Sequence, residues 1–181
     1  MKKFVSFLLA LMVLCSLAAC DGVSLKPSES EGPADKDGYI GDTMSTHWFD
    51  FTVNKAYSCS EYAGYTAEEG YQLVIAEVTL KNTFGISVDM WDTDFLILWD
   101  DPDENSGVEI TVPVYCEEQF PEEYVLGINE TKTGLLIYEV PEGFRDFAVV
   151  FQEIFEDPDD PTNEDGIDGD IFYVFFTAEK K

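Results

Sequence analysis

Short stretches in which apolar and polar residues alternate run through most of the chain after residue 47. A period of two is typical of β-strands that bury one face. In residues 71–82 (YQLVIAEVTLKN) the apolar side chains at 74, 76, 78 and 80 share one face, and the polar ones at 77, 79 and 81 share the other. Further strands are predicted at residues 48–58, 92–100, 108–116, 133–143, 144–155 and 170–180.

Turn-forming residues separate these runs. The acidic segment DDPDENSG (100–107) joins two of them and predicts a β-hairpin, in which Pro113 marks an edge or a bulge. Residues 117–126 suggest a short helical turn. Many short strands divided by turns, without a long helical pattern, predict an all-β fold, an antiparallel β-sandwich that forms one domain over residues 39–181.

The first nineteen residues are typical of a secretory signal peptide. Two lysines precede an apolar run that is too short for a comfortable membrane span, and small residues follow it. The order Leu-Ala-Ala-Cys at 17–20 resembles the bacterial lipobox, which implies cleavage before Cys20 and acylation of that cysteine. The alternative is an ordinary secreted protein with a chance cysteine. A lipid on Cys20 would hold the protein in a bilayer, on the extracytoplasmic face of the cell membrane.

Residues 20–38 differ from both neighbours in composition. After Cys20 they are rich in Ser, Pro, Gly, Asp and Glu and poor in apolar residues. Such a segment buries too little surface to offset the entropy of ordering, so we expect a flexible tether between the lipidated cysteine and the folded domain.

The charge balance is strongly acidic. The chain has 37 acidic and 10 basic residues, a net charge of −27, and loss of the leader with Lys2 and Lys3 makes it −29. Nucleic acid is excluded as a partner, because its binding relies on Lys and Arg at phosphates. Anionic membrane surfaces are disfavoured, whereas cations, cationic peptides and basic protein surfaces are favoured. Solubility alone is the simpler explanation of the charge.

Three segments together resemble a known domain family. They are EGYQLVIAEVTLKN (69–82), WDTDFLILWD (91–100) and LGINETKTGLLIYEVPEG (126–143), with landmarks at Asn82, Asp94-Phe95, Gly127, Gly134 and Val140-Pro141. They resemble the uncharacterised immunoglobulin-like domain family of small Gram-positive lipoproteins, whose label borrows the name of a telomere-binding factor and whose fold is similar to secreted immunoprotective antigens. The resemblance covers about residues 39–155 and implies an immunoglobulin-like sandwich on a lipoprotein. It brings no catalytic residues.

No pattern in the chain indicates an enzyme. His47 is the only histidine, so a His-based zinc site or a catalytic triad lacks its partners, and we expect a packing role. Nucleophilic side chains have no evident base. Three tryptophans and several tyrosines fill the sandwich or form an aromatic binding surface, and the sequence leaves both alternatives open: Trp48, Trp91, Trp99, Tyr57, Tyr62 and Tyr65.

Cys59 and Cys116 are the only cysteines of the mature chain besides Cys20. Each lies near the end of a predicted strand, and an exported domain meets oxidising conditions, so a disulfide between them is predicted. Free thiols buried in a core are the alternative.

Two acidic loops are candidate calcium sites. Calcium takes six to eight oxygen ligands, and loops 100–107 and 156–170 are rich in carboxylates. Neither loop has the full EF-hand spacing, so a site would be irregular and weak. The candidate ligands are Asp101, Asp103, Asn105, Asp165 and Asp168.

The sequence therefore predicts a membrane-anchored extracytoplasmic bacterial lipoprotein that is not an enzyme. Its folded domain would act as a binding or interaction module for an envelope protein, peptide or glycan. The alternative function is a calcium-responsive structural domain of the cell envelope, with Ca²⁺ as the only candidate cofactor.

Overall fold

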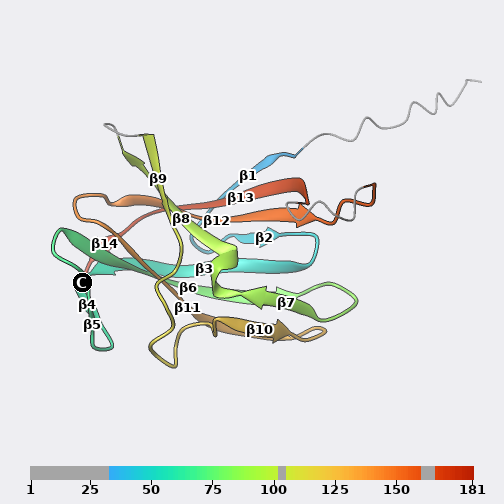
Figure 1. Ribbon diagram of the computed structural model, residues 1–181, viewed down its shortest axis with the longest axis horizontal. Coiled ribbons are helices and arrows are strands. Elements are labelled where there is room, and N and C mark those ends of the chain that lie inside the picture. The colour runs from blue at the N-terminus through green and yellow to red at the C-terminus, as the bar shows by residue number, and fades with distance from the viewer. Residues whose placement is uncertain (1–32, 102–104, 160–165) are drawn as a thin grey trace, which may run out of the picture. The chain divides into compact units, whose positions relative to one another are not determined.

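The structure of the protein is a computed structural model that describes residues 33–101, 105–159 and 166–181 (Figure 1). The predicted signal peptide, Cys20 and the tether up to residue 32 lie outside the described residues. Within the described ranges, no helix has the length and apolar content needed to cross a membrane.

Two twisted sheets form the two layers of the domain (Figure 1). Sheet A has the order β1-β13-β12-β8-β9, with bounds Asp35–Tyr39, Ile167–Thr177, Asp146–Phe155, Phe95–Asp101 and Asn105–Glu109. Sheet B has the order β11-β6-β3-β14, with bounds Thr131–Pro141, Tyr71–Asn82, Phe49–Cys59 and Glu179–Lys180, and β2 (Thr43–Ser45) also pairs with β3. Most pairs are antiparallel, but the edge strands β1 and β14 run parallel to β13 and β3.

Two short ribbons accompany the sheets. β7 (Val88–Trp91) pairs with β10 (Glu123–Leu126), and β4 (Glu61–Tyr62) pairs with β5 (Tyr65–Thr66). A single 3₁₀ turn, η1 (Asp92–Asp94), leads from β7 into β8.

The main core lies between the sheets and is rich in aromatic rings. Phe51 of sheet B is fully buried, and its ring centroid lies 5.3 Å from that of Phe95 and 6.2 Å from that of Phe172, both in sheet A. The alternate residues predicted for one face of 71–82 all enter this core. The predicted all-β, immunoglobulin-like antiparallel β-sandwich is therefore confirmed, with parallel pairing where β1 and β14 join the sheets.

The structure differs from the sequence prediction in three segments. The domain begins earlier, because β1 (Asp35–Tyr39) falls mostly within the range predicted as tether. β9 ends at Glu109, so the strand predicted for 108–116 is wrong beyond that point. Residues 117–126 hold a turn, in which the Gln119 amide donates to the Cys116 carbonyl at 3.3 Å, and also the strand β10, which was not predicted. These segments pair along an edge or in a short ribbon, where backbone hydrogen bonds suffice and little apolar patterning is needed.

A β-bulge in β3 changes which residues face outward. Val53 pairs with Val78 and Lys55 with Glu77, which leaves Asn54 as the extra residue. Before the bulge the odd-numbered residues of β3 are buried in the core, whereas after the bulge an even-numbered residue, Ala56, packs against it. Asn54 and Lys55 therefore both lie on the outer surface of sheet B.

Candidate binding groove on the outer face of sheet A

One row of apolar residues crosses the outer face of sheet A. The inward positions of β13, β12 and β8 fill the main core, so the residues between them face outward. The strand register places five of these outward residues side by side, one from each strand: Tyr39, Phe175, Ala148, Leu98 and Val108. Tyr39 is 65% exposed, Phe175 38% and Val108 54%. An apolar row on an outer face is unusual for a soluble sandwich, which normally places polar residues there.

Four residues of this row, Tyr39, Phe175, Ala148 and Leu98, line a groove of about 610 Å³. Tyr39 and Phe175 line it together with Tyr173, whose ring stacks on Phe175 with centroids 5.9 Å apart and planes at 10°. The Tyr39 and Phe175 rings lie 6.3 Å apart. Three adjacent aromatic rings from β1 and β13 thus present a preformed contact surface, with the Tyr39 ring tilted by 47° against that of Phe175.

Carboxylates flank the apolar row on both sides. Asp35 and Asp37 of β1 lie along one side, and Asp100 and Asp146 along the other. Asp146 accepts a hydrogen bond of 2.6 Å from the Thr177 hydroxyl. The other three make no hydrogen bond or ion pair with the described residues, and no lining residue of the groove is basic.

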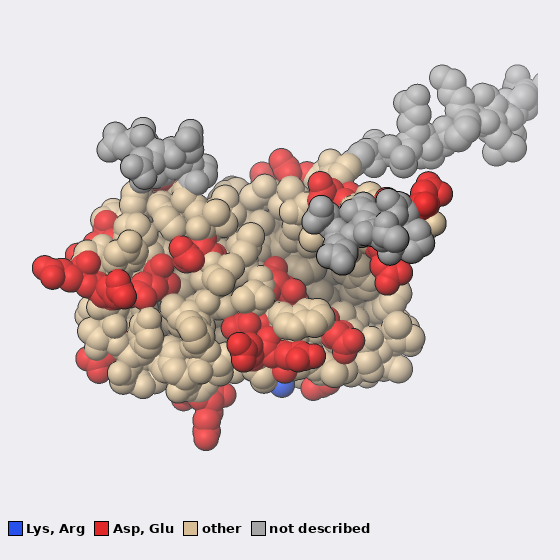
Figure 2. All heavy atoms as spheres, in the orientation of Figure 1, with Lys and Arg blue, Asp and Glu red and all other residues tan. Residues whose placement is uncertain are grey.

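The charged residues that line the groove are all acidic. Lys36 of β1 pairs with Asp170 at 3.4 Å and so is already engaged, while Arg145 is exposed and is not a lining residue. Desolvation by burial raises the pKa of Tyr173, and the nearby Asp35 and Asp37 carboxylates raise it further. Over the visible face of the molecule, carboxylates are widespread and Lys and Arg are almost absent (Figure 2). The groove therefore offers aromatic contact in a negative field.

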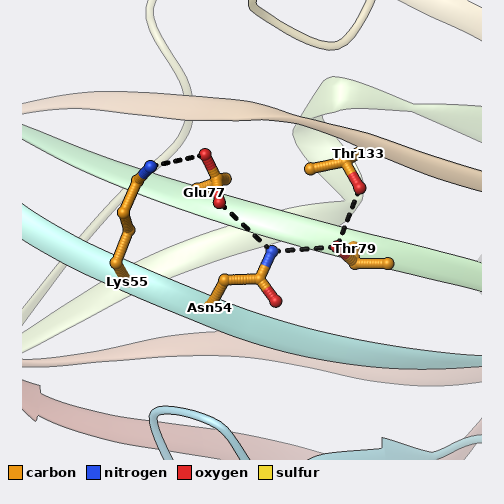
Figure 3. Close-up of polar contacts among 5 residues, drawn as sticks. All are labelled: Asn54, Lys55, Glu77, Thr79 and Thr133. Carbon is orange, nitrogen blue, oxygen red and sulfur yellow. Dashed lines mark hydrogen bonds and ion pairs between the residues drawn. The ribbon is translucent and has the colours of Figure 1, made fainter.

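The outer face of sheet B has a different chemistry. Asn54 donates a hydrogen bond of 2.8 Å to the Thr79 hydroxyl, which is 2.8 Å from that of Thr133, and Lys55 pairs with Glu77 at 2.7 Å (Figure 3). A smaller hollow of about 290 Å³ lies beside this ion pair. The polar groups here are already satisfied by one another, so this face offers less to a ligand.

The rest of that outer face is covered by a satellite cluster. Ile75, Leu73 and Ile137 point outward from sheet B and are nonetheless buried. The segment around residues 111–120 lies over them and is held by backbone bonds, such as Val112 N to Ile137 O at 2.8 Å. Tyr62 and Tyr65 from the β4-β5 ribbon pack against the same cluster.

Cys59 and Cys116 both belong to the surroundings of this satellite cluster. Cys59 is buried in it, Cys116 packs against it, and both thiols are free in the structure. The Cys116 thiol donates a hydrogen bond of 3.4 Å to Gln119 Oε1. Burial raises the pKa of both thiols, which disfavours the reactive thiolate at neutral pH. The structure thus brings the pair into one cluster, and the disulfide stays a prediction.

Most of the predicted calcium ligands fall where the structure gives no side-chain description. Asp103 and Asp165 lie outside the described residues, and so do the side chains of Asp101 and Asn105. Asp168 is exposed and accepts a hydrogen bond of 2.9 Å from Gln152. Within the described ranges, no group of three or more His, Cys, Asp or Glu side chains converges on a possible metal position. Calcium binding stays a prediction.

The candidate aromatic residues do not form one surface. Trp99 is buried in the main core and also lines the groove, whereas Trp91 is 45% exposed on β7. Tyr57 lies at the satellite cluster with Tyr62 and Tyr65. His47 packs against the rings of Trp48, Phe84 and Phe155, with centroids 5.3–5.4 Å apart, as expected for a packing role.

The family landmarks occupy structural positions. The buried Asn82 side chain donates to the carbonyls of Ile86 and Leu126 at 2.9 Å, and Asp94 accepts a bond of 2.8 Å from the Trp91 amide. A Cβ at Gly134 would press against the Phe120 ring. These contacts shape turns and packing, and none of these landmarks lines the groove.

No protein-family model and no curated protein matches the chain. Solved structures with a similar chain path include a candidate lipoprotein of Bacillus subtilis, ycdA, which is 11% identical with a TM-score of 0.49. The match covers 73% of this chain and 38% of that one. A candidate lipoprotein of Staphylococcus aureus is 10% identical with a TM-score of 0.49, and the match covers 79% of this chain and 96% of that one. An uncharacterised β-sandwich protein of Clostridium difficile is 16% identical with a TM-score of 0.44, and the match covers 80% of this chain and 97% of that one. At this level of similarity no residue role is transferred, and the fold assignment rests on the sheets themselves.

Sequence reasoning missed the groove as a site. Its aspartates are spread over residues 35–146, and its aromatic residues belong to strands at the two ends of the chain. One signal was available: in residues 170–180 the apolar residues are nearly continuous, so both faces of that strand carry apolar side chains. A strand of this kind is buried on both faces or presents an apolar surface.

Proposed function

We propose that this protein is a lipid-anchored binding module on the extracytoplasmic face of a bacterial cell membrane, and that its ligand occupies the groove on sheet A. The groove carries the binding part of the proposal, because it combines three adjacent aromatic rings with four carboxylates, none of them in an ion pair with a described residue, in one concavity. A concave, mainly apolar site with a few polar groups is the usual form of a binding site. No catalytic step is proposed.

The sequence order supports the anchoring part of the proposal. The lipobox-like segment ends at Cys20, and the first strand of the domain, β1, begins at Asp35 and forms one wall of the groove. The chain between these two residues can span at most about 50 Å. An acyl group on Cys20 would therefore keep the groove close to the membrane surface.

Anchoring is tested by detergent phase partitioning of the wild type and Cys20→Ala after expression in a bacterial host. We expect the wild type in the detergent phase and the variant in the aqueous phase. An unmodified N-terminus on wild-type protein in the aqueous phase contradicts the anchor.

Binding is tested by site-specific photocrosslinking in intact cells. A photoreactive phenylalanine analogue replaces Tyr39 at the groove, and the same analogue at Ile86 serves as the control because that side chain is similarly exposed (62%) and does not line the groove. We expect a discrete crosslinked product from position 39 that is absent from position 86. Equal labelling from both positions, or none from position 39, refutes the groove as the binding site.

A further inference from the structure

The spacing of charged and apolar rows in the groove specifies the kind of ligand that would fit it. Successive outward residues of a strand lie two positions apart, or about 7 Å. Asp37 lies in the row on one side of Phe175 and Ala148, and Asp146 lies in the row on the other side. Asp37, Phe175 and Asp146 belong to three neighbouring strands, β1, β13 and β12, so the groove presents carboxylate, apolar and carboxylate positions on a diagonal, with steps of about 7 Å along the strand direction and about 5 Å across it.

An extended peptide has the same repeat. Its side chains at alternate positions point to one side and also lie about 7 Å apart. A basic residue, an apolar residue and a second basic residue at such alternate positions would set the apolar side chain on the aromatic floor and each cation near a carboxylate. The stacked rings of Tyr173 and Phe175 add a favourable surface for the aliphatic stems and charged heads of Lys or Arg.

Charge distinguishes this ligand from the other possible occupants. A second copy of the chain would bring another strongly acidic surface, since the sequence has a net charge of −27. The chain's own segment 20–32 has more acidic than basic residues, so it is also a poor electrostatic complement to the carboxylates that flank the groove. Anionic lipid headgroups are repelled for the same reason.

We propose, building on the binding function above, that the groove on sheet A binds an extended peptide segment with the pattern basic–any–apolar–any–basic. The partner is thus a basic protein or peptide of the cell envelope, recognised through its cations and one central apolar side chain.

The test uses short blocked peptides and nuclear magnetic resonance titration of the mature domain at low salt. In the probe peptide, a lysine, a serine, a phenylalanine, a serine and a lysine follow one another. Matched peptides carry glutamate or glutamine in place of both lysines, or glycine in place of phenylalanine. We expect the probe to shift resonances of Tyr39, Ala148 and Phe175 and to bind more tightly than every matched peptide, with an affinity that falls as salt is added.

Variants locate the binding. Asp37→Asn/Asp146→Asn removes one carboxylate from each side, and the amide oxygen of the substituted side chain at position 146 can still accept the bond from Thr177. We expect roughly three- to tenfold weaker binding of the probe peptide. The control Asp89→Asn/Glu123→Gln makes the same change in net charge on the exposed β7-β10 ribbon and should leave the affinity within about twofold of the wild type.

Three results would overturn the peptide specificity. The first is equal binding of the lysine and glutamate peptides. The second is a loss of affinity in the control variant that equals the loss in Asp37→Asn/Asp146→Asn, because such a result would indicate unspecific charge attraction. The third is a shift of groove resonances with protein concentration alone, which would assign the groove to a second copy. Crosslinking from Tyr39 to a ligand that is not basic would leave the binding function standing and remove only this specificity.

Discussion

The outer faces of sheets A and B start from the same strand geometry and differ in what lies over them. On sheet B the outward apolar residues, such as Ile75 and Ile137, are covered by the segment around 111–120 and the β4-β5 ribbon. On sheet A the outward residues Tyr39, Phe175 and Val108 stay exposed, and carboxylates lie on both sides of the groove floor. The comparison shows that an apolar residue facing outward from a sheet can belong either to a second small core or to a surface for a partner.

The largest expected contrast is in stability when an apolar side chain is shortened on each face. Ile75→Ala removes a side chain that is 1% exposed in the satellite cluster, and we expect a loss of about 2–5 kcal/mol in the free energy of unfolding. Val108→Ala shortens a side chain that is 54% exposed on sheet A and should cost less than about 1 kcal/mol. Urea denaturation measures both, and similar losses would mean that the outer face of sheet A is also a core.

The cover of sheet B depends on a buried hydrogen bond. The Thr111 hydroxyl donates a bond of 3.0 Å to the carboxylate of Asp92, which is 6% exposed, and Thr111 also bridges to Tyr138 of β11. Thr111→Val leaves the buried carboxylate without this donor. We expect a loss of about 1.5–3 kcal/mol at neutral pH, because bonds to charged groups are among the stronger ones.

This loss should depend on pH in a defined direction. Desolvation by burial raises the pKa of Asp92, and the Thr111 bond lowers it, so the variant's Asp92 has a still higher pKa. A raised carboxyl pKa gives stability that is complete below the unfolded value and is lost as pH rises through the folded value. The gap between wild type and variant should therefore be small in acid, widen as pH rises from the folded pKa of Asp92 in the wild type to its still higher folded pKa in the variant, and then stay constant. A gap that does not change with pH contradicts this role of Asp92.

The polar ladder formed by Asn54, Thr79 and Thr133 on the outer face of sheet B contributes a smaller amount to the free energy of unfolding. Thr79→Val removes the acceptor for Asn54 and the partner of Thr133 at the β-bulge while it keeps a β-branched side chain. We expect a loss of about 0.5–1.5 kcal/mol. Thr66→Val on β5 is the control, since Thr66 is exposed and makes no side-chain hydrogen bond with the described residues. Equal effects of the two changes would show that the ladder adds no stability.

The smallest expected effect has opposite signs on the two faces. Lys55→Met breaks the ion pair with Glu77 on sheet B and should lower stability by about 0.2–1 kcal/mol at low salt. Asp35→Asn/Asp37→Asn removes carboxylates that repel one another on sheet A and should raise stability slightly. Both effects should shrink in high salt, where exposed charges are screened.

A matched change tests whether the Lys55 effect belongs to the ion pair. Lys81→Met removes the same charge from the β3–β6 strand pair, where Lys81 lies opposite Asp50 in the register and forms no ion pair with a described residue. It should change stability less than Lys55→Met.

Destabilisation by the Asp35→Asn/Asp37→Asn change would contradict the view that these carboxylates are kept for a partner instead of for the fold.

Local patterning was sufficient to predict most of the long strands of both sheets. β6, β11, β12 and β13 fall within two or three residues of their predicted ranges, because each buries at least one continuous face and the period of two is then visible in the chain. The hairpin between β8 and β9 was also predicted, from the acidic turn between them. Edge elements such as β1 and β10 were missed, since a strand that pairs on one side through its backbone needs no apolar face.

By itself, the sequence determined the all-β class, the acidic charge and the core positions of the central strands, because these depend on residue type and on contacts between near neighbours. The tertiary structure alone decided which outward residues are covered and which are open. Phe175 and Ile137 both sit on strands rich in apolar residues, yet one lies in the groove and the other under residues 111–120. That outcome depends on where segments far apart in the chain pack, and the order of β1, β13, β12 and β8 in sheet A brings Asp35, Asp146 and Phe175 to one site.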